Sequence, residues 1–319
     1  MALPSNTFAT YEAFGNREDL SDEIYRIDPT DTPFMSGIDR TSATAVNHEW
    51  QIQNLASVDS SNNVLEGDDA TTDAVTATVR RGNICQISDK VARVTGTQQA
   101  VDHAGRGDEL DYQAMLKGLE LKRDMETILC GRNVAKNAGA DATARVTAGV
   151  LSWIKTNTSK GGGAGADPSA ADGTSLRTDG TQRAFTEPLL KTVLSAIWTS
   201  GGKPDVIMAG AFNKQVFSTF TGRATPTEDT RAKKITAAVD AYESDFGTLR
   251  LVPDRFQRSR DVLVLQFDMW AVAYIKGRKM ASLTLAKTGD SDRRQILSEY
   301  GLEARNEASS GGVFDLTTS

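Results

Sequence analysis

The sequence has few of the residues from which catalytic and metal sites are usually built. Among 319 residues it has only two histidines, His48 and His103, and only two cysteines, Cys85 and Cys130. Neither histidine has a second histidine, a cysteine or a paired carboxylate at metal-ligand spacing, so we expect no metal site. Two cysteines are too few for a disulfide framework, which favours a reducing compartment and two small buried side chains.

Several catalytic and nucleotide-binding motifs are also absent. There is no Gly-x-Ser-x-Gly elbow, no dinucleotide-binding fingerprint and no histidine near Cys130 to activate its thiol. The glycines at 161–163 follow Lys160 instead of leading into a Gly-Lys-Ser/Thr sequence, which argues against a phosphate-binding loop. The sequence therefore offers no coherent active site, and we expect neither an enzyme nor a bound cofactor.

Long apolar runs and an excess of positive charge are missing as well. No stretch approaches the ~20 apolar residues of a membrane-spanning helix, and the N-terminus lacks the basic and apolar regions of a signal peptide. The net charge of −6 argues against a protein that binds nucleic acid directly. A protein that only encloses nucleic acid needs no excess of positive charge. We expect a soluble protein that is made in the cytoplasm and does not bind a membrane.

Residues Val46–Ile87 have the pattern of a long two-stranded excursion. Apolar residues alternate on its outgoing and returning segments, at Val46, Trp50, Ile52, Val75, Ala77 and Val79. Its tip carries five carboxylates without any Lys or Arg, at Asp59, Glu66, Asp68, Asp69 and Asp73. Such an acidic run is most simply a solvated loop. Because a two-stranded ribbon is only marginally stable alone, the alternative is a ribbon that lies on another surface.

The strongest helix prediction covers Asp108–Leu129. Asp108 suits the N-cap position, and one apolar stripe contains Leu110, Ala114, Leu121, Met125 and Ile128. A short helix is also predicted at Arg17–Ile27. The aperiodic segment Asp31–Met35 is predicted to be extended. It cannot bury Phe34 and Met35 by itself, so we expect these side chains against the long helix or a neighbouring subunit.

The second half of the chain predicts a glycine-rich loop, then helices, then strands. The segment 159–181 has the composition of a flexible surface loop outside any core. Helices are expected from Thr186 to Gly201 and over Ala211–Phe220, with a strand at Asp205–Ala209 between them. Further strands are expected at 248–252, 262–267, 271–275, 283–286 and 295–305. Helices followed by strands, without strict alternation, indicate an α+β fold.

This order of segments resembles the capsid fold that is named after a Hong Kong phage and shared by tailed phages, herpesvirus capsid floors and encapsulins. Short motifs resemble the major capsid family typified by the Sphingomonas phage SU-ten protein: Asp31-Thr32-Pro33-Phe34, His48-Glu49-Trp50, Tyr242-Glu243-Ser244-Asp245-Phe246-Gly247-Thr248 and Val252-Pro253-Asp254-Arg255. The resemblance implies the following divisions: an N-terminal arm at 1–45, an extended loop at 46–87, a peripheral domain at 88–184 and 286–319 with a spine helix at 108–129, and an axial domain at 185–285. Some relatives cross-link this loop through lysine, which residues 46–87 lack.

The resemblance implies a structural protein, a major capsid subunit. Such a subunit self-assembles as a homo-oligomer through hexamers and pentamers into an icosahedral head shell, and encloses double-stranded DNA without sequence-specific binding. Portal, scaffolding and decoration proteins are the further partners it implies, and the virion is the place, after synthesis in the host cytoplasm. The alternatives are an encapsulin-like nanocompartment shell protein and a non-catalytic oligomeric surface-layer protein.

A self-assembling subunit needs surfaces that only its copies complete. An apolar arm and an unsupported acidic ribbon are candidates for such surfaces. The candidate contact residues are Phe34 and Met35 in the arm, Trp50 in the ribbon and the five carboxylates of its tip. The cations expected to receive that tip lie at another ribbon's base and on the polar side of the spine helix: Arg80, Arg81, Lys117, Lys122 and Arg123.

Overall fold

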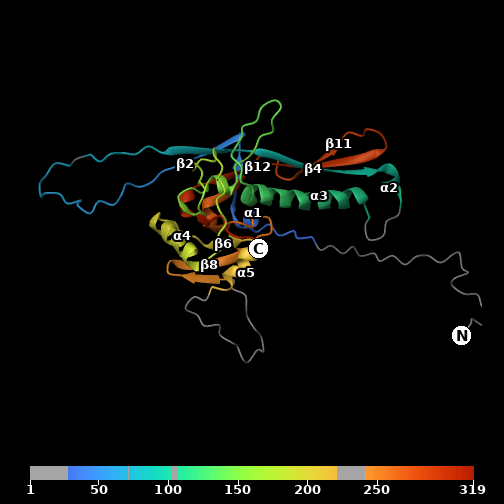
Figure 1. Cartoon of the computed structure of the whole chain (residues 1–319). Helices are drawn as coiled ribbons and strands as arrows, with labels where there is room; N and C mark the ends of the chain where they lie inside the picture. Colours follow the sequence, from blue (N-terminus) through green and yellow to red (C-terminus); the bar gives the residue numbers. More distant parts are fainter. Residues whose placement is uncertain (1–27, 71, 102–106, 221–240) are drawn as a thin grey trace, which may run out of the picture.

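A projecting ribbon and a long helix give the molecule an elongated shape (Figure 1). The computed structural model describes residues 28–70, 72–101, 107–220 and 241–319. The helix predicted at Arg17–Ile27 lies outside these residues. Helices and strands occur in mixed order along the described chain, which confirms the predicted α+β class. None of the described helices is long and apolar enough to cross a membrane.

The first sheet has five strands: β1 (Asp39–Ala43), β4 (Gln86–Thr95), β10 (Trp270–Ile275), β11 (Ala281–Leu285) and β12 (Ser291–Ala304). The long strand β12 is antiparallel to β4 along one edge and to β10 and β11 along the other. β1 adds to β10 in parallel. The strand predicted at 295–305 is confirmed within β12, although β13 follows it, and its side chains Ile296, Tyr300 and Leu302 are buried together in the core.

The spine helix packs against this sheet as the apolar stripe predicts. It consists of α3 (Glu109–Glu126) and a π-helical turn (Thr127–Gly131), and it follows the short α2 (Gly96–Ala100). The Asp108 side chain accepts a hydrogen bond from the Asp111 N–H at 2.9 Å, which confirms the predicted N-cap. The helix ends at Gly131, where a Cβ atom would collide with the carbonyl oxygen of Phe256.

The second sheet has six strands in the order β5 (Asn157–Ser159), β13 (Gly311–Val313), β9 (Val262–Leu265), β6 (Val206–Ala209), β8 (Gly247–Pro253) and β7 (Ala241–Ser244). The helices α4 (Glu187–Thr199) and α5 (Ala211–Phe217) accompany it. The predicted inner face of α4 is buried, at Leu190, Val193, Leu194 and Ile197. Short 3-10 turns occur at Val150–Ser152, Phe267–Met269 and Glu307–Ser309.

Each sheet takes strands from both sides of residue 285, where the resemblance placed a domain boundary. β10 and β11 precede residue 285 but pair with β12 in the five-stranded sheet. β13 follows it but pairs with β9 in the six-stranded sheet. The chain passes from one sheet to the other between β9 and β10, through the 3-10 turn Phe267–Met269.

The glycine-rich segment 159–181 contributes to the core, so its prediction as a loop outside any core was wrong. Arg177 is only 2% exposed, and its guanidinium lies 3.5 Å from the centroid of the Phe314 ring. Its Nη1 atom donates to Asp167 Oδ1 at 2.5 Å. Gly173 is buried against the Trp153 ring with a φ of +74°. Polar and glycine-mediated packing leaves no hydrophobic pattern in the sequence, which is why the composition misled the prediction.

The segment predicted to be extended at Asp31–Met35 begins a short helix instead, α1 (Pro33–Gly37). Proline is favoured in the first turn of a helix because its fixed φ suits that position. The Thr32 side chain makes no capping hydrogen bond. The free N–H groups of this first turn are bound by a residue of the spine helix, a tertiary contact that local sequence does not reveal.

Candidate functional site

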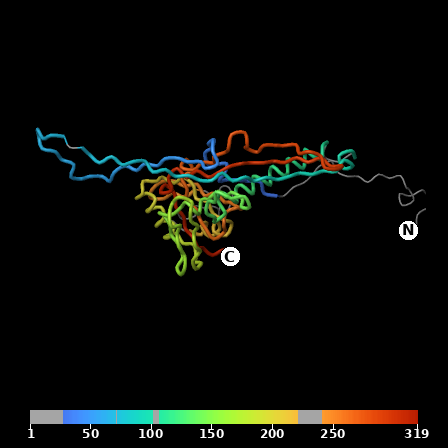
Figure 2. The backbone as a smooth tube through the Cα atoms, turned by 90° about the horizontal axis from the view of Figure 1, so that it is seen from above, coloured from blue at the N-terminus to red at the C-terminus, as the bar shows by residue number. Residues whose placement is uncertain are grey.

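The predicted two-stranded excursion forms a ribbon that projects from the body of the molecule (Figures 1 and 2). Its base is an antiparallel pair of strands, β2 (Asn47–Ile52) and β3 (Val79–Ile84). The returning strand begins at Val79, so the prediction that Val75 and Ala77 belong to it was wrong. The residues beyond this pair are rich in turn formers and form the tip, residues 53–78.

Apolar side chains of the tip are almost fully exposed. Their exposed fractions are 98% for Leu55, 97% for Val58, 74% for Val64, 80% for Leu65 and 95% for Val75. Apolar side chains gathered on one projecting segment usually mark an interaction surface. A loop adapted only to water has no need of them. The tip therefore has the character of a surface that another molecule covers.

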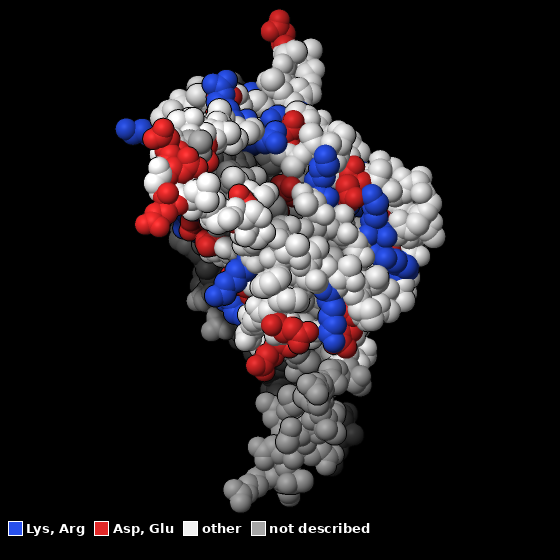
Figure 3. Space-filling view, turned by 90° about the vertical axis from the view of Figure 1, so that its left-hand side faces the viewer, with Lys and Arg blue, Asp and Glu red and all other residues white. Residues whose placement is uncertain are grey.

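The five acidic residues of the tip are also exposed, and none forms an ion pair with a described residue: Asp59, Glu66, Asp68, Asp69 and Asp73. Asp59 accepts a hydrogen bond from the Ser61 N–H at 2.8 Å, and Asp68 accepts one from the Asp69 N–H at 3.0 Å. These local bonds leave the negative charge uncompensated. Viewed toward the ribbon, acidic side chains gather mainly on the left and a band of basic ones lies on the right (Figure 3).

The base of the ribbon is attached to the body through aromatic and polar contacts. The Trp50 ring lies 5.4 Å from the Trp153 ring, centroid to centroid, and is partly buried. His48 Nε2 lies 3.0 Å from Glu303 Oε2. Lys136 donates from Nζ to the carbonyl oxygen of Gly82 at 2.5 Å. Trp50, predicted as a subunit contact, therefore holds the ribbon to its own subunit.

The five cations predicted to receive the tip of another ribbon differ in whether they already have a partner in their own subunit. Arg80 lies 3.4 Å from Glu49, and Lys117 lies 2.8 Å from Glu120. The Arg123 guanidinium lies 5.6 Å from the centroid of the Phe256 ring. Arg81 and Lys122 form no ion pair with a described residue, but the charge of Arg81 helps to lower the pKa of Asp172 in its own subunit.

Phe34 and Met35 lie in the core of their own subunit, against the spine helix. Phe34 is 0% exposed and Met35 is 6% exposed. The Phe34 N–H donates to Glu126 Oε1 at 2.6 Å, and the Met35 N–H donates to Glu126 Oε2 at 2.8 Å. The Glu126 carboxylate thus takes the place of a helix N-cap for α1 and fastens it to α3.

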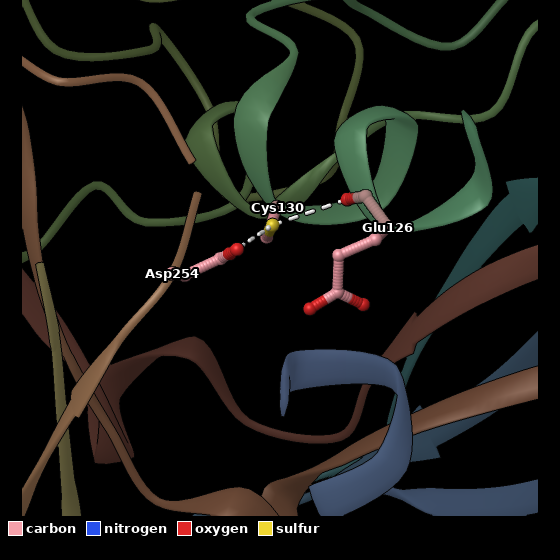
Figure 4. Close-up of side chains that lie close together, drawn as sticks. All are labelled: Glu126, Cys130 and Asp254. Carbon is pink, nitrogen blue, oxygen red and sulfur yellow. Dashed lines mark hydrogen bonds between the residues drawn. The ribbon is translucent and has the colours of Figure 1, made fainter. Parts of the chain in front are cut away.

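Glu126 belongs to a buried cluster with Cys130 and Asp254 (Figure 4). Cys130 Sγ donates to Asp254 Oδ2 at 3.1 Å, and this connects the spine helix to the loop after β8. Burial raises the pKa of Glu126 to about 7, aided by the negative charge of Asp254 and opposed by the hydrogen bonds from α1. Burial likewise raises the pKa of Asp254. The arm, the spine helix and the loop after β8 therefore meet at two carboxyl groups, Glu126 and Asp254, whose pKa values burial raises.

The cluster does not suit a metal ion. Its ligand atoms lie within 4.8 Å of one another, but both Glu126 oxygens already accept hydrogen bonds from α1. Zinc requires the thiolate form of cysteine. Burial and the neighbouring carboxylates raise the pKa of Cys130 well above its usual value, which favours the thiol. The cluster is therefore a buried polar joint that connects α1, the spine helix and the loop after β8 through hydrogen bonds.

Sequence reasoning missed this joint. Glu126 and Cys130 are four residues apart in the spine helix, a spacing that places them on one helical face beside Leu129 and Met125. This spacing is the feature of the sequence that could have indicated a polar cluster on the spine helix. Asp254 comes from a distant segment, and only the folded structure brings its carboxylate to the other two groups.

A sequence profile of the SU10 major capsid protein family matches residues 3–317. The chain belongs to this family. It is 28% identical to the major capsid protein of Escherichia phage Phieco32, with 98% of each chain covered. The fold is that of the cyanophage A-1(L) capsid, with a TM-score of 0.64, 13% identity and coverage of 98% of this chain and 99% of that one. The SrpI encapsulin of Synechococcus elongatus has a TM-score of 0.56, 10% identity and 93% coverage of each chain.

Membership of this family makes the chain a major capsid protein of a phage, a structural component of the virion. The predicted capsid fold and family are confirmed. Encapsulins share the fold alone, so the encapsulin alternative is less well supported than the phage capsid.

Proposed function

We propose that copies of this chain close into an icosahedral head shell by laying each ribbon on a neighbouring subunit, through hexamers and pentamers that enclose double-stranded DNA. The observation that carries the proposal is the ribbon tip, whose apolar side chains are nearly fully exposed. The tip has no basic residue and the net charge of the chain is −6, so we expect the shell to enclose DNA without binding its phosphates tightly.

The apolar residues of the tip supply most of the contact energy. Covering a Val or Leu side chain contributes about 1.5–3 kcal/mol, so the exposed residues named above together contribute on the order of 10 kcal/mol before ordering costs. An exposed ion pair contributes only about 0–1 kcal/mol. The carboxylates therefore set the register of the contact and make it depend on ionic strength.

The two sheets take different places in the proposed shell. The five-stranded sheet with α3 corresponds to the peripheral domain, and the six-stranded sheet with α4 and α5 corresponds to the axial domain, which points to the centre of each capsomer. These assignments follow the sheets and replace the boundary expected at residue 285. β1 lies in the expected arm at 1–45 and β4 begins in the expected extended loop at 46–87, so in this proposal both strands are counted with the peripheral domain.

Further copies of the chain are the main partners in this proposal. Portal, scaffolding and decoration proteins are the others, and the subunit is made in the host cytoplasm before it enters the virion. The chain acts as a structural protein without catalysis, as its family implies.

The test is to replace residues 55–75 with a short Gly-Ser turn that joins the ribbon strands. The tip makes no ion pair with the described body, so the shortened subunit is expected to remain folded by circular dichroism. It is expected to sediment as subunits or capsomers under conditions in which the full chain sediments as shells. Normal shells from the shortened chain would refute the proposal.

A further inference from the structure

The short helix α1 is held in place by a carboxyl group of the spine helix. The Glu126 oxygens accept hydrogen bonds from the Phe34 and Met35 N–H groups, at 2.6 and 2.8 Å. α1 also contacts the 3-10 turn that connects the two sheets: the Phe34 ring lies 6.1 Å from the Phe267 ring, centroid to centroid, and a Cβ atom on Gly37 would collide with that ring. A five-residue helix has few internal hydrogen bonds, so the position of α1 depends on these contacts.

A second buried carboxyl group, that of Asp254, lies next to Glu126. Asp254 is 2% exposed, and its side chain accepts hydrogen bonds from the Phe256 N–H at 2.8 Å and from the Cys130 thiol at 3.1 Å. Its own N–H donates to the carbonyl oxygen of Ala209 at 3.0 Å, which ties the cluster to the six-stranded sheet. Figure 4 shows the Glu126 carboxyl group directed from the spine helix toward α1, beside Cys130 and Asp254.

No cation among the described residues balances these two carboxyl groups. Neither Glu126 nor Asp254 forms an ion pair with a described residue, and the third polar group of the cluster, the Cys130 thiol, is itself an acid. α1 contains no charged residue. On the elements packed around the cluster, the nearest charged residues along the chain are partly or fully exposed to water: Asp31, Asp39, Arg123, Asp124, Arg132, Arg255 and Asp268.

Two ionised carboxyl groups in such a place are unfavourable, because each loses its hydration and each repels the other. Burial and the charge of Asp254 raise the pKa of Glu126 to about 7, although the hydrogen bonds from α1 oppose this shift. Movement of α1 away from the spine helix would give the Glu126 carboxyl group access to water and return its pKa toward the ordinary 4.5. The ionised form of Glu126 therefore favours an open arrangement, and the protonated form favours the closed one.

We infer that Glu126 and Asp254 form a proton-dependent latch between α1 and the spine helix, which closes when the pair takes up a proton and loosens when the pair loses it. Loosening frees the arm segment at 28–38, whereas β1 remains paired with β10. The latch thus makes the position of the arm depend on pH. This inference goes beyond the proposed function, since it concerns the single subunit and requires no assembly.

Hydrogen exchange of the isolated full-length subunit at pH 5 and pH 8 tests the latch. The Phe34 and Met35 N–H groups exchange only after their hydrogen bonds to Glu126 break. Their protection, corrected for the intrinsic dependence of exchange on pH, is expected to fall on the order of 50-fold from pH 5 to pH 8, because the pKa of Glu126 is about 7 in the closed form and near 4.5 in the open form. The buried amides of β9 should exchange more slowly than those of α1 at both pH values, since local opening requires less free energy than unfolding of the subunit.

Three variants assign the effect to the two carboxyl groups. E126Q keeps an acceptor for α1 but binds no proton in this range, so its corrected α1 protection should change less than about threefold between the two pH values. D254N removes the neighbouring charge and keeps an acceptor for the Phe256 N–H, so its change should lie between those of E126Q and wild type. The matched control E120Q, on the same helix but partly in water beside Lys117, should keep the wild-type change.

Three results would overturn the latch. The first is equal corrected protection of the wild-type α1 amides at pH 5 and pH 8. The second is α1 protection as high as that of β9, which would mean that only unfolding of the whole subunit exposes Glu126. The third is a D254N variant with the full wild-type change, which would leave Asp254 without a part in the latch and decides the matter even if E126Q does not fold. None of these results depends on assembly, so failure of the latch and failure of the proposed function are distinguishable.

Discussion

Replacing Glu126 with glutamine removes a carboxylate that the fold holds away from water. Glu126 is 0% exposed. Burial and the charge of Asp254 raise its pKa from 4.5 to about 7, against the opposing effect of the α1 hydrogen bonds. Since one pKa unit corresponds to about 1.4 kcal/mol, ionising Glu126 costs about 3 kcal/mol more in the folded subunit than in the unfolded chain.

The raised pKa determines the sign of the pH effect. Above about pH 7 the ionised carboxylate destabilises the folded subunit by the full amount, and protonation relieves this as the pH falls toward 4.5. Glutamine binds no proton in this range and still accepts one N–H from α1. Between pH 8 and pH 5, the wild-type subunit should therefore gain about 2–3 kcal/mol of unfolding free energy relative to E126Q.

Urea unfolding of the isolated subunit at pH 8 and pH 5, followed by circular dichroism, measures this difference. The matched control is Glu120→Gln on the same helix, where the carboxylate lies partly in water beside Lys117. This control should keep the wild-type dependence on pH. The reasoning is refuted if wild type and E126Q change equally in stability between the two pH values.

Other predictions concern the core, the glycine-rich segment and the tip. Phe34→Ala should lower the unfolding free energy by about 3–5 kcal/mol in urea titrations, because the ring is fully buried; an effect below 1 kcal/mol would contradict its place in the core. A peptide tag inserted after the exposed Gly163 should leave the subunit folded, whereas the same tag after the buried Gly173 should unfold it; equal tolerance by circular dichroism would refute this. Replacing Asp68 and Asp69 with lysine should weaken shells in sedimentation across a salt titration and leave the subunit's melting temperature nearly unchanged. Unaltered assembly would instead support the interpretation of the acidic tip as a solvated loop without a role in assembly.

Elements with a strong periodic signal could be predicted from the sequence. The stripe of α3 and the inner face of α4 follow from helical spacing, and the structure bears them out, as it does the Asp108 cap. Alternating spacing also predicted the base of the ribbon, but the paired strands end at Ile52 and Val79 and do not include Val75 and Ala77. The acidic residues of the tip could also be recognised from the sequence. Its exposed apolar residues were present in the sequence, but their meaning appeared only when the structure showed how little covers them.

Features that depend on contacts between distant segments could not be predicted. α1 forms because Glu126, far along the chain, binds its first N–H groups. The segment 159–181 folds around Arg177, whose partners come partly from the C-terminal region. The pairing of Arg93 with Arg293 depends on a strand register that no local pattern specifies. In each case the determining interaction is polar or long-range, and hydrophobic periodicity does not record it.

In the proposed function, copies of this chain build a closed shell. Negative-stain electron microscopy of the purified full-length protein, across a range of protein and salt concentrations, would show whether they do. We expect hexamers, tubes or closed shells whose abundance changes with ionic strength. A protein that remains a folded single subunit under every one of these conditions would contradict it.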